Sequence, residues 1–69
     1  MSVRGPVADA LSALELDDRV VVVRACCRGQ TVAEVAAALG VPREIVKARL
    51  SSGLRALREA LQQNGVIES

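Results

Sequence analysis

The 69-residue chain has no phenylalanine, tryptophan, tyrosine or histidine, and these absences exclude several classes of function. Proteins that read single-stranded DNA or RNA stack bases on aromatic rings, so the missing aromatics argue against that mode of binding. Without histidine, the chain lacks the usual general base and the commonest neutral metal ligand. Nor does the sequence offer a nucleophile–base pair or a phosphate-cradling glycine loop. We therefore expect a protein that is not an enzyme and needs no cofactor.

Cysteine is scarce, and the two present, Cys26 and Cys27, are adjacent. Neighbouring side chains on a helix point about 100° apart, so a disulfide between them is geometrically poor. Two thiols alone cannot close a tetrahedral zinc site. We expect both to be small hydrophobic residues in or near the core of a cytoplasmic protein, rather than redox sensors. The apolar run Val20 to Val23 is far too short to span a membrane, so we expect no membrane contact.

Charge is nearly balanced over the whole chain, at +1, but it is unevenly distributed. Residues 1–30 carry four basic and four acidic side chains. Between positions 43 and 58, Glu44 alone opposes five basic residues, namely Arg43, Lys47, Arg49, Arg55 and Arg58. A local basic stripe of this kind suits contact with phosphates, although most such clusters are solvated helix faces.

Apolar residues recur at helical spacing and predict an all-α domain of four helices. Val7, Leu11 and Leu14 indicate a short first helix. A second helix is predicted over 18–28, because the preceding residues resemble a helix start and the Arg28-Gly29 pair resembles a stop. Four consecutive valines there also have high β propensity, but the sequence offers no second strand to pair with.

At the start of this second helix we predict Asp17 as the N-cap. Leu16, just before it, is predicted to form a hydrophobic staple with Val21. Its buried face is expected to carry Val20, Val23 and Cys27, with Arg24 and Arg28 directed toward solvent or phosphate.

The stretch from Thr31 to Leu50 predicts a helix, a tight turn and a second helix. Thr31 and Glu34 form a capping-box pattern. An apolar stripe comes next. Gly40 then allows the chain to turn, and Pro42 favours the start of the following helix. The stripe consists of Val32, Val35, Ala36 and Leu39. This is the layout of a helix-turn-helix, whose second helix enters the DNA major groove.

The last helix is predicted to be long, because apolar residues repeat at intervals of three and four until Asn64-Gly65. They are Val46, Leu50, Leu54, Leu57 and Leu61. Gly53 interrupts this pattern and indicates either close packing or a slight bend. We therefore expect a disordered lead over 1–6, the domain over 7–63 and a flexible tail over 64–69.

With these features in place, the chain resembles region 4 of bacterial sigma factors, specifically of the small extracytoplasmic-function (ECF) group. The resemblance covers residues 7–63. Matching positions are Leu11, Leu14, Arg19, Gly29, Glu34-Val35-Ala36, Leu39-Gly40, Val46-Lys47-Ala48-Arg49-Leu50 and the tail from Leu54 to Leu61. At 44–45, where that family usually has Gly-Thr, this chain has Glu44-Ile45.

The resemblance implies a function in transcription initiation. A region 4 domain binds the −35 promoter element while attached to RNA polymerase through the β-subunit flap, and an anti-sigma factor holds it inactive by masking it. A complete sigma factor also needs a region 2, which these residues do not supply, so we expect a detached or excised region 4.

The resemblance and the helical pattern together predict three sets of site residues. The base-facing set lies on the second helix of the motif and consists of Lys47, Ala48, Ser51, Ser52 and Arg55, which otherwise form an ordinary solvent face. Predicted phosphate contacts are Thr31, Arg43 and Arg49, with salt bridges as the alternative for the two arginines. The distal leucines Leu54, Leu57 and Leu61 are expected to belong mostly to the core and to offer their far end to a protein partner.

Two alternatives from other classes remain at this point. One is a helix-turn-helix regulator of the LuxR type, which would dimerise on palindromic sites. The other is a helical domain that binds only proteins. The low net charge of the chain and the serines in the base-facing set favour this alternative.

Overall fold

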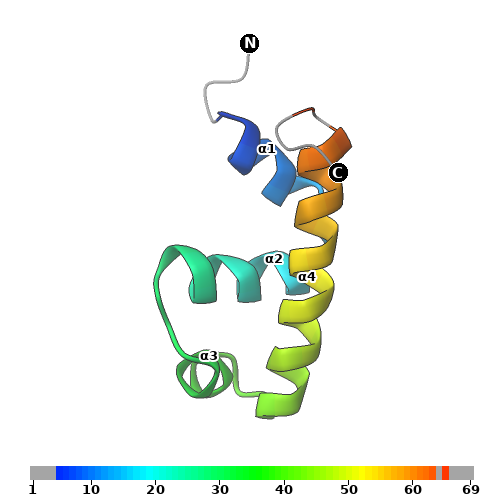
Figure 1. Cartoon of the computed structure of the whole chain (residues 1–69). Coiled ribbons are helices and arrows are strands. Elements are labelled where there is room, and N and C mark those ends of the chain that lie inside the picture. The colour runs from blue at the N-terminus through cyan, green and yellow to red at the C-terminus, as the bar shows by residue number, and fades with distance from the viewer. Residues whose placement is uncertain (1–4, 64, 66–69) are drawn as a thin grey trace.

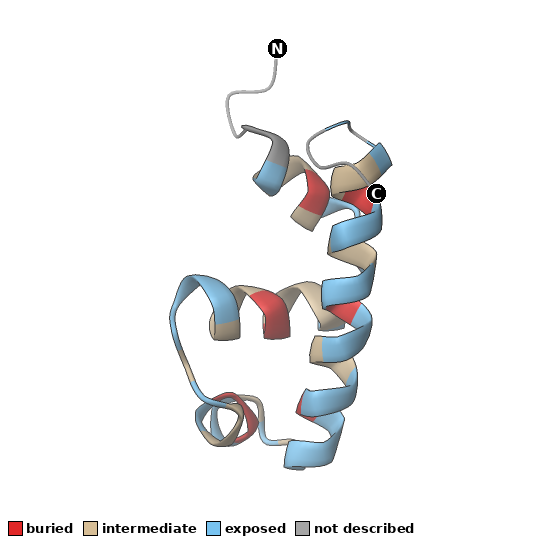
Figure 2. Cartoon of the chain, viewed as in Figure 1, coloured by how far each residue is buried: buried red, intermediate tan, exposed pale blue. Residues whose placement is uncertain are grey.

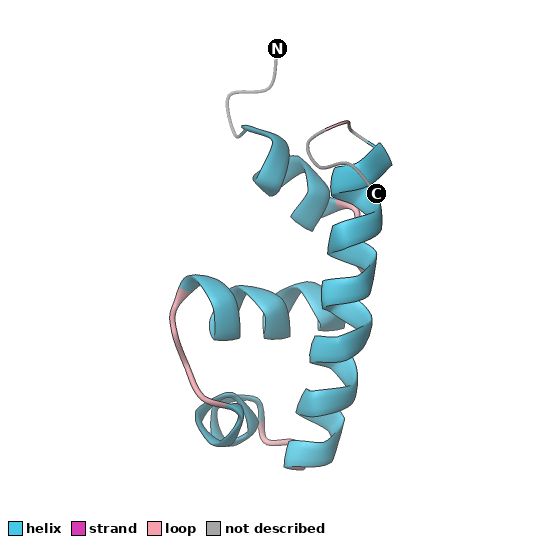
Figure 3. Cartoon of the chain, viewed as in Figure 1, coloured by secondary structure: helices cyan, strands magenta, loops and turns pink. Residues whose placement is uncertain are grey.

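The computed structural model describes residues 5–63 and 65, and every regular element in that part of the chain is helical (Figure 1, Figure 3). The elements are α1 (Gly5–Ser12), α2 (Leu16–Val22), η1 (Val23–Cys27), α3 (Val32–Leu39) and α4 (Arg43–Gln63). η1 is a single π-helical turn that continues α2. The predicted all-α, four-helix architecture with an extended last helix is confirmed.

Helix α1 begins at Gly5, so residues 5 and 6, predicted as part of a disordered lead, lie in its first turn. Proline is well tolerated in the first helical turn, where its missing N–H costs nothing, so Pro6 starts the helix rather than breaking it. Residues 1–4 lie outside the described residues, as do 64 and 66–69 of the predicted tail.

Helix α4 is the long element against which the other helices pack (Figure 1). α1 lies beside its C-terminal part, α2 crosses its middle, and α3 lies beside its N-terminal end (Figure 1). α3 is viewed almost end-on while α2 and α4 lie in the plane of the picture, so the three helices run in clearly different directions (Figure 1).

The main core is aliphatic and small, as the composition requires. Its buried members are Val21, Val35, Ala36 and Val46, with Val32, Leu39, Val41 and Leu50 packed around them. The predicted stripe of α3 therefore faces this core. Nearer the C-terminal end of α4, Ala10 and Leu14 are buried, as is Ala60 on α4 (Figure 2). Val7, predicted to share their stripe, is exposed.

α2 and α4 pack closely at Gly53, which is buried. A Cβ atom added there would lie 2.6 Å from Cγ2 of Val22 and 3.2 Å from the carbonyl oxygen of Asp18. Close packing is therefore the reason for this glycine. The buried line of α4 runs through Val46, Gly53 and Ala60, at intervals of seven residues. Leu54 lies beside that line and is 42% exposed, so the predicted leucine stripe is only partly the core face.

Helix α2 starts differently from the prediction. It begins at Leu16, and its N-cap is Glu15, whose backbone is extended and whose side chain makes no capping hydrogen bond. Asp17 lies inside the first turn, where its negative charge favours the positive end of the helix dipole. Leu16 is 63% exposed, so the predicted staple onto Val21 is also wrong.

The predicted buried face of α2 is wrong as well. Val21 and Val22 are buried, whereas Val20 and Val23 are only half-buried. Four valines in a row carry no periodicity, so the sequence could not indicate which pair α3 and α4 would cover.

Cys26 and Cys27 are exposed, which contradicts the prediction that they fill the core. They lie in the π turn, where the amide of Arg28 donates to the carbonyl of Val23 at 3.1 Å, five residues back. One extra residue in a turn rotates the residues after it by about 100° relative to an α-helix, and a periodicity of 3.6 does not anticipate that rotation.

Candidate nucleic-acid interface

The capping box predicted for α3 is present. The amide of Thr31 donates to Oε1 of Glu34 at 2.9 Å, and the amide of Glu34 donates to Oγ1 of Thr31 at 3.1 Å. Both residues are exposed. These bonds fix the N-terminal end of α3, and the first-turn amides of Val32 and Ala33 stay directed out of the helix end, as in any α-helix.

The turn between α3 and α4 is also as predicted. Gly40 has φ 68° and ψ 36°, in the left-handed region that favours glycine. The next amide, of Val41, donates to the carbonyl of Ala36 at 3.1 Å, and the Val41 side chain packs on the core. Pro42 then precedes α4, and its carbonyl accepts from the amides of Ile45 and Val46 at 3.1 and 3.3 Å. A rigid turn of three residues thus sets the direction of α4 relative to α3.

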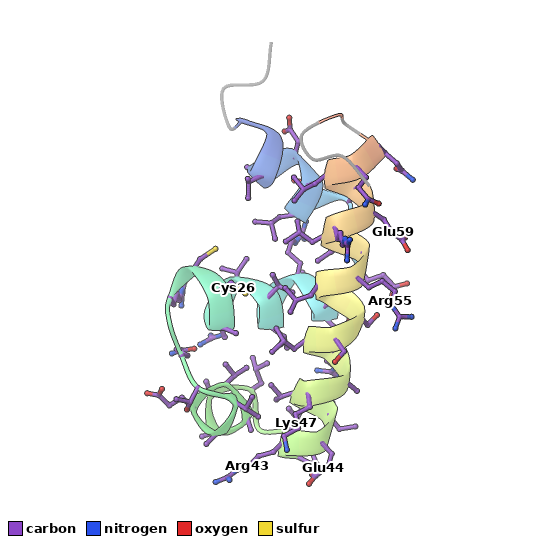
Figure 4. All side chains as sticks on the ribbon, viewed as in Figure 1. Cys26, Arg43, Glu44, Lys47, Arg55 and Glu59 are labelled. Atoms are coloured by element: carbon purple, nitrogen blue, oxygen red, sulfur yellow. The ribbon has the colours of Figure 1, made fainter. Side chains whose placement is uncertain are left out.

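The N-terminal half of α4 presents an exposed face opposite the core. Lys47, Ala48, Ser51 and Arg55 of the predicted base-facing set are all exposed. Advancing by 100° per residue, they fall on one side of the helix, away from Val46 and Gly53. Figure 4 shows Arg55 directed away from α2, and Lys47 with Arg43 and Glu44 near the N-terminal end of α4. The structure therefore brings four of the five predicted residues together on one open surface.

Ser52, the fifth member, lies at the edge of this face. Its hydroxyl donates to Oδ2 of Asp18 in α2 at 2.9 Å. The hydroxyl is therefore engaged between two helices instead of being directed outward, and it depends on a contact 34 residues away in sequence. Helical periodicity alone could not reveal that partner.

Of the two arginines predicted to contact phosphate, Arg43 is exposed at the first position of α4. Arg49 is different: its Nη2 lies 3.9 Å from Oδ2 of Asp17, and its side chain is 32% exposed, against 72% for Asp17. An ion pair this open to solvent is worth little, about 0–1 kcal/mol. A phosphate group would therefore compete readily for the same guanidinium.

Glu44 is a residue of this face that the prediction missed. It is exposed in the first turn of α4 and lies on the same side as Ser51 and Arg55. A carboxylate there suits the positive end of the helix dipole and can accept from the amino group of cytosine. The signal was available, since Glu44 already lay opposite the apolar stripe of the sequence.

The predicted partner-binding leucines are divided by the fold. Leu54 is exposed, whereas Leu57 and Leu61 are half-buried. A partner approaching this side of α4 therefore meets Leu54 most directly.

Other kinds of site find no support in the described part of the chain. Between residues 5 and 63 and at Gly65, no group of three or more His, Cys, Asp or Glu side chains could hold a metal ion. No helix in those same residues is long and apolar enough to cross a bilayer.

Comparison with known proteins agrees with the family resemblance of the sequence. The family model for "Sigma-70, region 4" matches residues 10–59. Curated proteins named "ECF RNA polymerase sigma factor SigL", from three strains of Mycobacterium tuberculosis, are 43% identical to this chain over 60 residues. The match covers 87% of this chain and 34% of each relative, so the chain spans about a third of the length of the curated relatives it matches. The arrangement of a capped α3, a glycine turn and a long α4 thus occurs in a chain that belongs to the sigma-70 region 4 family.

Proposed function

We propose that this chain recognises the −35 element of promoter DNA as the region 4 domain of an ECF sigma factor. The observation that carries the proposal is the open, basic face of α4, which a capped α3 and a rigid three-residue turn hold in place. The family match and the name of the relatives support this function over that of a LuxR-type regulator.

In this proposal the N-terminal half of α4 lies in the major groove, which is about 12 Å wide and admits an α-helix. Lys47 then addresses guanine acceptors, and Ala48 contacts a thymine methyl group. Ser51 and Arg55 continue the same face, while Glu44 accepts from cytosine. Ser52 takes part only if its hydroxyl leaves Asp18 or donates through water.

Phosphate contacts flank this reading face. Arg43 lies at the first residue of α4, and Arg49 becomes available when it exchanges Asp17 for a phosphate. Thr31 and the first-turn amides of α3 form the third phosphate-binding position, where the helix dipole favours an anion. Because the negatively charged Glu34 carboxylate already lies at that end of α3, we expect this phosphate-binding position to be the weakest of the three.

The protein partners belong to the same proposal. A region 4 domain of this group works on RNA polymerase, held through the β-subunit flap, and is inhibited by an anti-sigma factor. The exposed Leu54 and the neighbouring Leu57 and Leu61 provide apolar surface on the C-terminal half of α4 for such a partner. We expect the protein to act in the cytoplasm, where transcription takes place.

A binding selection tests the DNA proposal. The 69-residue chain is incubated at low salt with duplexes that contain a randomised core of about 12 base pairs, and the enriched sequence is then titrated by fluorescence anisotropy. We expect one non-palindromic motif, because a single region 4 domain reads one half-site. Enrichment of a palindrome, or of no sequence, would contradict the proposal.

Point variants then locate the reading face. Lys47→Ala should weaken binding to the enriched duplex by about 1–3 kcal/mol, because it removes a base contact. Arg43→Ala should instead lower the slope of log K against log salt by about 0.9, as the loss of one phosphate contact does. Arg58→Ala is the charge-matched control, because Arg58 is exposed on α4 but lies roughly 16 Å along the helix from Lys47. An equal effect from Arg58→Ala would show that only net charge matters.

A further inference from the structure

A basic, partly apolar surface lies on α2 and η1, on the side opposite their buried valines. It contains a shallow depression of about 290 Å³ lined by Arg19, Val20, Val23, Arg24 and Arg28. A second depression, of about 280 Å³, is lined by Leu16, Asp17, Val20, Leu39, Val41 and Arg49. Val20 lines both, so the two depressions are neighbours on one side of α2. We call their combined lining the Val20 surface.

The floor of the Val20 surface is apolar and open. Leu16 is 63% exposed, the largest exposed fraction among the large hydrophobic residues described. The other floor residues remain half-buried after the domain has folded, and they are Val20, Val23, Leu39 and Val41. A further apolar group placed here would remove hydrocarbon surface from water, at about 25 cal/mol per Å².

The rim of the Val20 surface is strongly basic. Its arginines are Arg19, Arg24, Arg28 and Arg49, and its one acidic residue is Asp17, which lies beside Arg49. Arg24 donates to Oε1 of Gln30 at 3.4 Å, a long bond that leaves the rest of its guanidinium available. Guanidinium groups bind carboxylates in a bidentate manner, so this rim matches carboxylate-bearing side chains.

The π turn of η1 contributes to this rim. In an uninterrupted α-helix, Arg28 would lie nine residues from Arg19, on the opposite side of the helix and close to the direction of Val21. The extra residue of η1 rotates Arg28 by about 100°, onto the side that carries Arg19 and Arg24. Single π turns occur frequently at functional sites, where such a rotation places a side chain.

From these features we propose that the Val20 surface is a docking site for an acidic amphipathic helix of a protein partner. Leucine-like side chains of that helix would cover Val20 and Val23, and its acidic residues would pair with Arg24 and Arg28. DNA is the less suitable occupant, because phosphate contacts need the arginines but gain nothing from an apolar floor. A helix laid in a groove uses both.

This inference goes beyond promoter recognition and does not depend on it. The Val20 surface consists mainly of residues of α2 and η1, whereas the reading face belongs to α4. Arg49 is the one residue that the Val20 surface shares with the proposed phosphate contacts. It also differs from the leucines on the C-terminal half of α4 that were predicted to meet a partner. Binding of the peptide is measured without DNA, so its failure would leave the promoter proposal standing, and the reverse also holds.

The test uses the whole 69-residue chain, labelled with ¹⁵N, and a designed helical peptide of about 16 residues. The peptide has leucines at positions i, i+3, i+4 and i+7 and glutamates on both flanks. A control peptide keeps the leucines and replaces every glutamate by lysine. Affinity is measured by fluorescence anisotropy, and the site is located by amide chemical-shift changes.

Variants of the chain make the test specific. Arg28→Glu reverses one exposed rim charge and should weaken the acidic peptide about fivefold or more. Val20→Thr keeps the side-chain shape while making the floor polar, and it should also weaken binding. Arg58→Glu carries the same charge change on α4, away from the Val20 surface, and is the matched control. Far-ultraviolet circular dichroism verifies that each variant is folded.

The proposal predicts that the acidic peptide binds, that the lysine peptide does not, and that shifts centre on Val20, Val23 and Arg28. Four results of the peptide titrations would overturn it, and a fifth would come from competition with DNA. The four are no binding of the acidic peptide, equal binding of the lysine peptide, equal weakening by Arg58→Glu and Arg28→Glu, and shifts centred elsewhere. Displacement of the peptide by a DNA duplex that itself shifts Arg24 and Arg28 would assign the surface to phosphate instead.

Discussion

Replacing Gly53 by alanine tests how closely α2 and α4 pack. In an exposed helix position the change from glycine to alanine stabilises the protein by about 1 kcal/mol, because alanine has the higher helix propensity. Here the new methyl group would lie 2.6 Å from Cγ2 of Val22 and 3.2 Å from the backbone oxygen of Asp18. Real Cβ atoms do not approach that closely, so either α2 or the valine must move.

The expected change in the free energy of unfolding on Gly53→Ala is the difference between two opposing effects. Overpacking a core costs about 1–3 kcal/mol. Val22 is only 1% exposed and has a β-branched, stiff side chain, so its methyl cannot turn aside cheaply. Subtracting about 1 kcal/mol of helix propensity leaves a net destabilisation of about 1 kcal/mol, within a range of about 0–2. In a domain of this size that corresponds to a fall in Tm of about 4–8 °C.

Urea denaturation followed by circular dichroism at 222 nm measures this change, and a double-mutant cycle gives its cause. Val22→Ala alone should destabilise the domain through the cavity that it leaves. Adding Gly53→Ala to that variant should then be neutral or stabilising, because the alanine methyl occupies the vacated space. The free energy of coupling between the two positions is expected to be about 1 kcal/mol or more.

The difference in stability between Ser51→Gly and Ser51→Ala on the exposed face of α4 is the reference for the glycine-to-alanine change without packing. If Gly53→Ala stabilised the chain by as much as an exposed glycine-to-alanine change, α2 and α4 could not approach each other as closely as the 2.6 Å separation requires. If the Val22→Ala background did not rescue the variant, the clash would involve some other contact.

Two further predictions concern single features. Thr31→Ala removes the hydroxyl that caps α3 and should destabilise the domain by about 1 kcal/mol, whereas Thr31→Ser should leave its stability nearly unchanged; urea titration of both variants decides. Cys26 and Cys27 are exposed, so both thiols should react with Ellman's reagent in the native chain about as fast as in denaturant. A native thiol protected from the reagent would mean that the cysteines belong to the core after all.

The helix-turn-helix could be predicted because its signals are local. The capping box joins residues three apart, and the turn depends on one glycine that adopts positive φ. Such interactions form within a few residues of each other, so the sequence displays both partners. The same holds for the exposed side of α4, where Lys47, Ser51 and Arg55 lie opposite the apolar positions.

Features of the second helix could not be predicted, because they depend on distant partners. Val21 and Val22 are buried only because Val35, Val46 and Gly53 come to lie against them. The π turn at Val23–Cys27 changes the register of the residues after it, and no pattern within those five residues announces it. The exposed cysteines lie in that π turn, whereas the engaged hydroxyl of Ser52 depends on Asp18, a partner 34 residues away.

The helical class, the position of the turn and the basic character of α4 follow from the amino-acid sequence, because periodicity, capping and composition act over a few residues. The packing of the helices, by contrast, sets which valines enter the core and why position 53 must lack a side chain. The direction of Arg28 follows from the π turn that precedes it. The burial of the valines and the close contact at position 53 depend on how whole helices meet across long separations in the chain. The free energy of that packing outweighs the weak local preferences of a valine run or a cysteine pair.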